Sequence, residues 1–170
     1  MKRCIILLLL LTCAYARAQD HGFQIRDRNI IWQKVFVSDL DSAAIMQAIS
    51  LSGSFSDLQG KSLRVLPHEI DYRAAGYVRG RVPMVFLASL LSGHAVIEFR
   101  PGRYRVTVDH LILTENMTTS LFEKGRERAL EGIALNRAGE MKQSFLESVD
   151  ILDVDLSQIF TFKTIEKEDW

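Results

Sequence analysis

The chain has 170 residues, with 21 basic and 21 acidic side chains, so its formal net charge at pH 7 is zero. A nucleic-acid-binding protein normally gathers a basic surplus on one face, so this balance argues against nucleic acid as a partner. Both cysteines, Cys4 and Cys13, lie within the first 18 residues. The remainder therefore has neither disulfides nor thiolate metal ligands, and its stability must come from a packed core.

Residues 1–18 have the features of a secretory signal peptide. A positive end at Lys2 and Arg3 precedes an apolar run from Cys4 to Leu11, which is too short for a membrane span of about 20 residues. The triplet Ala16-Arg17-Ala18 fits the small-residue pattern of a cleavage site. We therefore expect export through the inner membrane and a periplasmic or secreted protein that begins at Gln19.

The alternative is a lipid anchor on Cys13, but Thr12 stands where a small Gly or Ala is expected. Cleavage after Ala18 leaves 18 basic and 21 acidic residues. No later segment is apolar enough to span a bilayer, so we expect no transmembrane segment after cleavage.

The first elements alternate between extended and helical patterns. Residues 19–28 are polar and are interpreted as a loose leader. Asn29–Val37, NIIWQKVFV, is rich in β-branched and aromatic residues and predicts a strand with apolar groups on both faces. Ser38–Gly53 predicts a helix, because Ser38 and Asp41 resemble a capping box and apolar residues follow at helical spacing.

The middle of the chain is less regular. Leu58–Leu66 predicts a strand stopped by Pro67, and Gly76–Val82 predicts another strand by alternation. Pro83–Gly93, PMVFLASLLSG, fits either a buried strand or a short core helix, which periodicity alone does not separate. We favour the strand because this segment leads directly into a hairpin.

The clearest element is a β-hairpin over His94–Leu113 with its turn at Pro101-Gly102. If Arg100 faces Arg103, alternation and charge pairing select the same register. The apolar face then pairs Phe99 with Tyr104, Ile97 with Val106 and Ala95 with Val108, and the polar face pairs Glu98 with Arg105 and His94 with Asp109.

The pattern becomes helical after Thr114. Ser120 and Glu123 form a helix-start signature. Met141, Phe145, Val149 and Leu152 recur at helical spacing and predict an apolar stripe. We expect residues 114–162 to pack on a sheet domain formed by residues 29–113, and residues 163–170 to be a frayed tail. The predicted class is α+β, a single curved antiparallel sheet with helices on one face.

The strand IIWQKVFV, the amphipathic helix after it and the hairpin FRPGRYRVTV resemble domain-of-unknown-function family 4468, a family of secreted bacterial proteins. The resemblance covers roughly Ile30 to Leu113. It implies a fold like that of the TATA-binding protein (TBP), with a curved antiparallel sheet. It implies no reaction, so no catalytic residue is carried over, and a DNA-binding fold does not imply DNA binding.

Two groups of polar residues are candidates for a recognition patch. His94, Glu98, Arg105 and Asp109 share the outer face of the hairpin, where they either form solvated cross-strand pairs or recognise a ligand. A metal site on His94 and Asp109 would need further ligands that the sequence does not supply. The arginines at 79, 81, 100, 103 and 105 either bind acidic glycans or phospholipid headgroups or simply protect sheet edges. The expected patch is Arg79, Arg81, His94, Glu98, Arg103, Arg105 and Asp109.

No sequence motif marks a catalytic or metal site. His68-Glu69 lacks the second histidine of a zinc protease, and Asp150, Asp153 and Asp155 lack the glycine and terminal glutamate of an EF-hand. Asp109 and His110 are neighbours on a predicted strand, so they should point to opposite faces, with His110 inward. We therefore expect no catalytic residues, no metal and no cofactor.

We expect a non-enzymatic exported domain that binds a protein, lipid or glycan of the cell envelope. One alternative is a hydrolase whose residues meet only in three dimensions, for which His68, His94 and Asp109 should approach one another. Another is a structural subunit of an envelope assembly, joined through an exposed Met141–Leu152 stripe.

Overall fold

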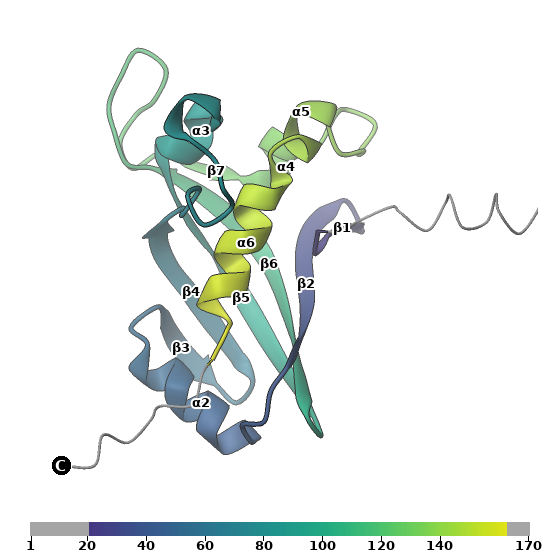
Figure 1. Ribbon diagram of the computed structural model, residues 1–170. Coiled ribbons are helices and arrows are strands. Elements are labelled where there is room, and N and C mark those ends of the chain that lie inside the picture. The colour runs from purple at the N-terminus through teal and green to yellow at the C-terminus, as the bar shows by residue number, and fades with distance from the viewer. Residues whose placement is uncertain (1–20, 163–170) are drawn as a thin grey trace, which may run out of the picture.

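The computed structural model describes residues 21–162. In this part of the chain, seven strands form one antiparallel sheet in the order β1-β2-β6-β5-β4-β3, with β7 also paired to β6. Figure 1 shows helix α6 lying across one face of this sheet. The expected α+β class with a single antiparallel sheet is confirmed. The predicted signal peptide, its cleavage site, Cys13 and the tail at 163–170 lie outside the described residues.

The strands are β1 (Phe23–Arg26), β2 (Asn29–Val37), β3 (Phe55–Gln59), β4 (Ser62–Glu69), β5 (Ser89–Arg100), β6 (Arg103–Glu115) and β7 (Glu127–Ala129). The helices are α2 (Ser42–Leu51), the 3-10 helix η2 (Arg79–Arg81), α3 (Met84–Leu87), α4 (Leu130–Ala134), α5 (Gln143–Leu146) and α6 (Val149–Ile159).

The predicted hairpin is confirmed in its register as well as its position. Strands β5 and β6 pair Arg100 with Arg103, and every pair predicted outward from that turn is observed as far as His94 with Asp109. Gly102 in the turn has a φ of 70°, a conformation that glycine adopts without steric cost. The apolar face of the hairpin is buried, with Ile97, Val106 and Val108 fully inaccessible.

One hydrophobic core lies between the inner face of the sheet and the helices. Trp32 of β2 stacks on Phe160, which follows α6, with ring centroids 6.0 Å apart. The hydroxyl of Tyr104 donates a 2.6 Å hydrogen bond to the Phe160 carbonyl. Leu152 and Leu156 of α6 are also fully buried. The end of α6 is therefore fixed to the sheet by both stacking and a buried hydrogen bond.

Several expectations for the first half of the chain are wrong in detail. Residues 23–26 of the expected loose leader form β1, which pairs with β2. Helix α2 begins at Ser42, because Asp41 is its N-cap and accepts a 2.7 Å hydrogen bond from the Ala44 N–H. Pro67 lies inside β4 at a register shift between Val65 and His68, where its missing N–H is tolerated.

The segment before the hairpin is also different from the prediction. The strand expected over residues 76–82 is absent, and the chain there forms only the short helix η2. Residues 83–93 contain both of the alternatives considered: the single turn of α3, followed by the first residues of β5. The alternation seen in 76–82 was too short to distinguish a strand from an irregular surface segment.

The helix predicted from Ser120 is wrong as well. The carboxylate of the buried Glu115 accepts a hydrogen bond from the Glu123 N–H and lies 2.6 Å from Arg128 Nε. These contacts fold the segment back on β6, and it continues as β7. The sheet therefore takes strands from outside the expected 29–113 range. The later apolar stripe is largely as predicted, with Phe145, Val149 and Leu152 buried.

Candidate functional site

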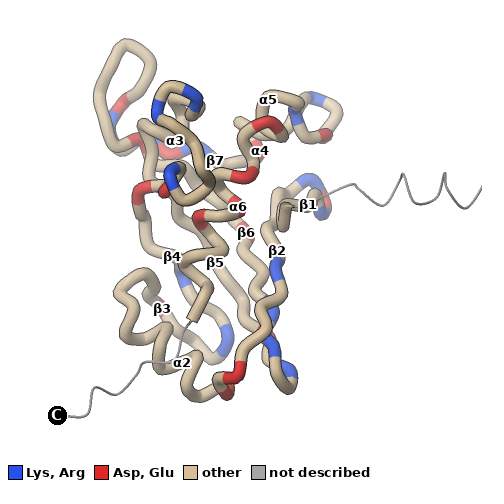
Figure 2. The backbone as a smooth tube through the Cα atoms, in the orientation of Figure 1, with Lys and Arg blue, Asp and Glu red and all other residues tan. Residues whose placement is uncertain are grey.

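The outer face of the sheet is the face opposite the core, and its centre is polar. The buried residues of the described helices belong to the same core as the inward-facing residues of the strands. These helices therefore pack on one face of the sheet. On the outer side, His94 and Glu98 are exposed, and Arg105 and Asp109 are half-buried. Figure 2 shows basic and acidic positions interspersed along these strands. This face is where the described chain offers polar side chains for recognition.

A β-bulge reshapes the outer face beside His94. Ser92 pairs with Ile112 and His94 pairs with Asp109, so the single residue Gly93 faces two residues of β6. One of the two, His110, has a φ of 48°, in the left-handed region that non-glycine residues rarely adopt. A Cβ at Gly93 would lie 3.0 Å from Val108 Cγ1 and 3.2 Å from the Asp109 carbonyl oxygen, so any larger residue would have to displace these neighbours.

The bulge places two consecutive side chains on the same face. Strict alternation predicted that His110 points inward, and that prediction is wrong. Its side chain is 82% exposed, and its Nδ1 lies 2.9 Å from Asp109 Oδ1. The extra residue in β6 shifts the alternation by one position, which turns His110 outward.

Four side chains from three strands form a continuous hydrogen-bonded chain on this face. Ser62 Oγ lies 2.7 Å from His94 Nε2, and His94 Nδ1 lies 3.3 Å from the Asp109 oxygen that His110 also contacts. An ionised carboxylate only accepts hydrogen bonds, so it favours a proton on each contacting Nδ1. In neutral His94, this leaves Nε2 free to accept the hydroxyl proton of Ser62.

A pocket of about 310 Å³ lies over this hydrogen-bonded chain. Its lining includes Asp57, Ser62, Arg64, Ser92, His94 and His110. The hydrogen bond to Asp109 raises the pKa of His110 above its ordinary value of 6.5. The pocket therefore combines hydroxyl groups, a guanidinium and a histidine whose charged form is favoured by its neighbour.

The structure keeps only part of the predicted recognition patch together. Glu98 and Arg105 form an ion pair with a 2.6 Å contact, and His94 and Asp109 are in hydrogen-bond reach, as predicted. Arg103 lies at the hairpin tip, opposite Arg100. These five positions share the hairpin.

Arg79 and Arg81 are not part of this group, which corrects the prediction. They lie on η2, next in the chain to α3 and the Ser89 end of β5. The arginines of the tip lie at the other end of β5, roughly 35 Å away along an extended strand of this length. The five arginines therefore do not form one basic patch.

The trio proposed for a hydrolase, His68, His94 and Asp109, does not meet. His68 Nε2 lies 2.9 Å from the buried Asp155 of α6. Asp155 also accepts a hydrogen bond from the Asp71 N–H. Burial lowers the pKa of His68, but the hydrogen bonds to Asp155 and the Leu66 carbonyl outweigh it and raise the pKa above 6.5. His68 thus ties β4 to α6 on the core side.

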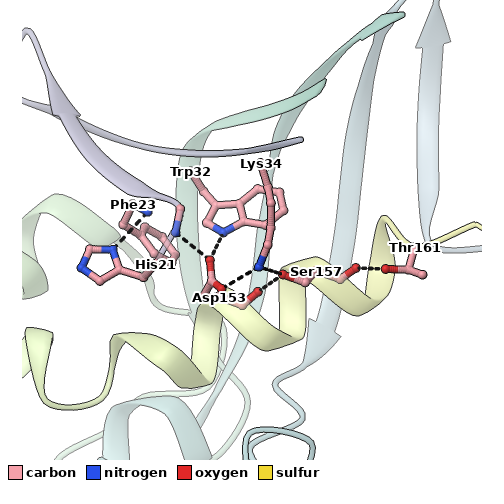
Figure 3. Close-up of polar contacts among 8 residues, drawn as sticks. His21, Phe23, Trp32, Lys34, Asp153, Ser157 and Thr161 are labelled. Atoms are coloured by element: carbon pink, nitrogen blue, oxygen red, sulfur yellow. Dashed lines mark hydrogen bonds and ion pairs between the residues drawn. The ribbon is translucent and has the colours of Figure 1, made fainter. Parts of the chain in front are cut away.

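A second buried carboxylate, Asp153, attaches α6 to β2, which lies in the other half of the sheet from β4. Figure 3 shows Asp153 pointing toward β2, where its Oδ1 accepts hydrogen bonds from Trp32 Nε1 at 2.7 Å and the Gly22 N–H at 2.8 Å. Its Oδ2 lies 2.9 Å from Lys34 Nζ. Burial alone would raise the pKa of Asp153, but these partners hold it below the ordinary value of 3.8.

The acidic residues of α6 therefore serve separate contacts. Asp153 and Asp155 have different protein donors, and Asp150 is exposed. Among residues 21–162, no group of three or more His, Cys, Asp or Glu side chains is arranged to hold a metal ion. In the same part of the chain, no helix has the length and apolar character to cross a membrane.

Sequence reasoning missed two members of the outer-face chain, Ser62 and His110. Ser62 belongs to a strand whose start the pattern did not locate, and its contact with His94 is diagonal across two strands. His110 was assigned to the wrong face because a bulge leaves no simple trace in hydrophobic alternation. Gly93 inside a predicted β segment was the available signal, since glycine in a strand often marks a bulge.

No protein-family model matches the chain, and no curated protein matches it. Similar solved structures include a DUF4468 family protein from Bacteroides ovatus, with 13% sequence identity, a TM-score of 0.47 and coverage of 89% of this chain and 97% of that one. They also include a TBP-like protein from Parabacteroides distasonis, with 7% identity, a TM-score of 0.45 and coverage of 81% and 94%. The solved structures similar to this chain thus include a member of the family that its sequence resembles and a protein of the TBP-like fold.

Proposed function

We propose that the protein is an exported domain of the bacterial cell envelope that binds a protein, lipid or glycan partner through the outer face of its sheet. The observation that carries this proposal is the asymmetry of the sheet. One face is buried under helices, and the other presents polar side chains and a pocket of about 310 Å³. A concave pocket with a few convergent polar groups is the usual form of a binding site for a small molecule.

The export part of the proposal rests on the N-terminal pattern and is tested by fractionation. Protein expressed from the full sequence should be recovered from the periplasm or the medium with Gln19 at its N-terminus. Mass spectrometry of the intact protein reads the cleavage site directly. An acylated Cys13 in the membrane fraction would replace this proposal with the lipid-anchored alternative, and an uncleaved cytoplasmic chain would contradict both.

The binding part is tested by capture of envelope components with the mature domain, comparing the wild-type protein with surface variants. Arg105→Glu reverses a charge on the outer face, next to Glu98. Arg137→Glu is the matched control, since Arg137 is exposed in the turn between α4 and α5. Partners of the outer face should be lost with the first variant and retained with the second. Equal capture by both variants would place the binding surface elsewhere.

Two competing functions have less support. The structural-subunit alternative required an exposed stripe, but three of its four members are buried in the described chain. The hydrolase alternative in its original form required His68 beside His94, and His68 instead contacts Asp155. The expectation that the domain is not an enzyme stays a prediction, because it rests on the absence of motifs along the sequence.

A further inference from the structure

Motif searches along a sequence do not detect residues that strands bring together, and one such set lies on the outer face. Ser62 of β4, His94 of β5 and Asp109 of β6 contact one another in the order hydroxyl, imidazole, carboxylate. We propose that these residues form an esterase site in which Ser62 is the nucleophile, His94 its base and Asp109 the residue that orients the base. This activity goes beyond the proposed binding role, which does not depend on it.

The atoms in contact are those that the chemistry requires. Ser62 Oγ lies 2.7 Å from His94 Nε2, and Asp109 Oδ1 lies 3.3 Å from His94 Nδ1. In a serine hydrolase, Nε2 takes the proton of the nucleophile and Nδ1 is held by the orienting carboxylate. An orienting carboxylate fixes the proton on Nδ1, so Nε2 can take the proton of Ser62. His110 Nδ1 lies 2.9 Å from the same Asp109 oxygen and adds a second contact that holds the carboxylate.

The reaction is the hydrolysis of a carboxylic ester in two steps. Ser62 Oγ attacks the carbonyl carbon while its proton moves to His94 Nε2. The ester C–O bond then breaks, the alcohol leaves with that proton, and Ser62 carries the acyl group. Water, activated by the same nitrogen, attacks the acyl-serine and releases the acid, which restores the Ser62 hydroxyl and neutral His94. Ester and water are thereby converted to acid and alcohol.

The pocket selects the class of ester. Arg64 pairs with His94 across β4 and β5 and lines the same pocket, and it takes part in none of the ion pairs of residues 21–162. Its guanidinium is the cation available to the negative charge that develops on the carbonyl oxygen. The modest volume suits a short acyl group rather than a long acyl chain.

The experiment measures the rate of p-nitrophenyl acetate hydrolysis, and mass spectrometry of the quenched protein locates any acetyl group. Wild-type protein should show an initial burst and an acetyl group on Ser62. Ser62→Ala and His94→Gln should each lower the rate by about a hundred-fold or more. Ser50→Ala is the matched control, since Ser50 is exposed on α2 and does not line the pocket. It should keep both the burst and the rate, and circular dichroism should show that all four proteins are folded.

Asp109→Asn separates a positioning role from a structural one. It should lower kcat while leaving KM for the ester unchanged, and Asp109→Glu should restore part of kcat. A wild-type rate retained by Ser62→Ala would show that histidine alone reacts with this ester, which overturns the proposal. Absence of acetylated Ser62 in the quenched wild-type protein would overturn it too. Either result leaves capture of envelope partners, and so the binding proposal, unaffected.

Discussion

Replacement of Asp153 should be among the most destabilising changes in the chain. Asp153→Ala removes the acceptor of two hydrogen bonds, from Trp32 Nε1 and the Gly22 N–H. The buried Trp32 Nε1–H without a partner costs about 1–3 kcal/mol, and the half-buried Gly22 N–H adds a smaller cost because water reaches it more easily. Lys34 adds little, because its side chain is 37% exposed and can turn to water. We expect a loss of about 3 kcal/mol in the free energy of unfolding.

Urea denaturation followed by far-ultraviolet circular dichroism measures this loss. Asp150→Ala is the matched control, since Asp150 is exposed on the same helix. It should change the free energy of unfolding by less than about 1 kcal/mol. If the two variants have equal stability, the contacts of Asp153 do not stabilise the fold and the reasoning is refuted.

The lowered pKa of Asp153 predicts that the free energy of unfolding depends on pH. The folded pKa of Asp153 lies below its ordinary value of 3.8, so the charged form is the one that folding favours. Its contribution is therefore fully present above the ordinary pKa and is lost as the pH falls through the folded pKa. The stability difference between wild type and Asp153→Ala should narrow over that acidic range. A constant difference would contradict the assigned role of the charge.

Further predictions concern β4 and the bulge. The pKa of His68 is raised in the folded protein, so its stabilisation is present below the ordinary pKa of 6.5 and is lost as the pH rises through the folded pKa. Unfolding at a series of pH values should show this loss in the wild type and not in His68→Gln. Gly93→Ala should destabilise the protein by about 1–3 kcal/mol in urea denaturation, because its Cβ would crowd Val108. Gly80→Ala should be nearly neutral, since nothing lies within 4 Å of its Cβ, and similar effects of the two changes would contradict the bulge.

The parts of the fold that the sequence predicted are those in which two physical signals agree. In the hairpin, alternation and charge pairing selected one register, and that register is observed. The first strand was predicted from β-branched and aromatic residues over nine positions, and β2 has those bounds. Where one weak signal acted alone, as at Ser120 or in residues 76–82, the predicted element is absent: the Glu123 N–H donates to the Glu115 carboxylate, and residues 79–81 form η2.

The candidate site was only half predictable for the same reason. His94, Asp109, Glu98 and Arg105 followed from the register, which sequence can define. Ser62 required the pairing of β4 with β5, a contact between residues 32 positions apart. The carboxylates of α6 were interpreted only as an acidic cluster without an EF-hand pattern, because nothing local shows that Trp32 and His68 supply their donors. Non-local pairing is what a single sequence specifies least clearly.

His110→Gly distinguishes the bulge from a regular strand by the sign of its effect. In the bulge, His110 adopts a left-handed backbone that costs a non-glycine residue about 1 kcal/mol, and glycine removes this cost. The exposed contact with Asp109 is worth less than about 1 kcal/mol, so we expect the variant to be as stable as the wild type or slightly more stable. Thr107→Gly, an outward position in the regular part of β6, should instead lose about 1–2 kcal/mol, from the glycine backbone and from the lost 2.8 Å hydrogen bond that Gln33 Nε2 donates to Thr107 Oγ1. If His110 pointed inward, as alternation predicted, its removal would leave a cavity and cost about 3 kcal/mol. A loss of that size in urea denaturation would refute the bulge, and with it the outward-facing His110 beside the pocket.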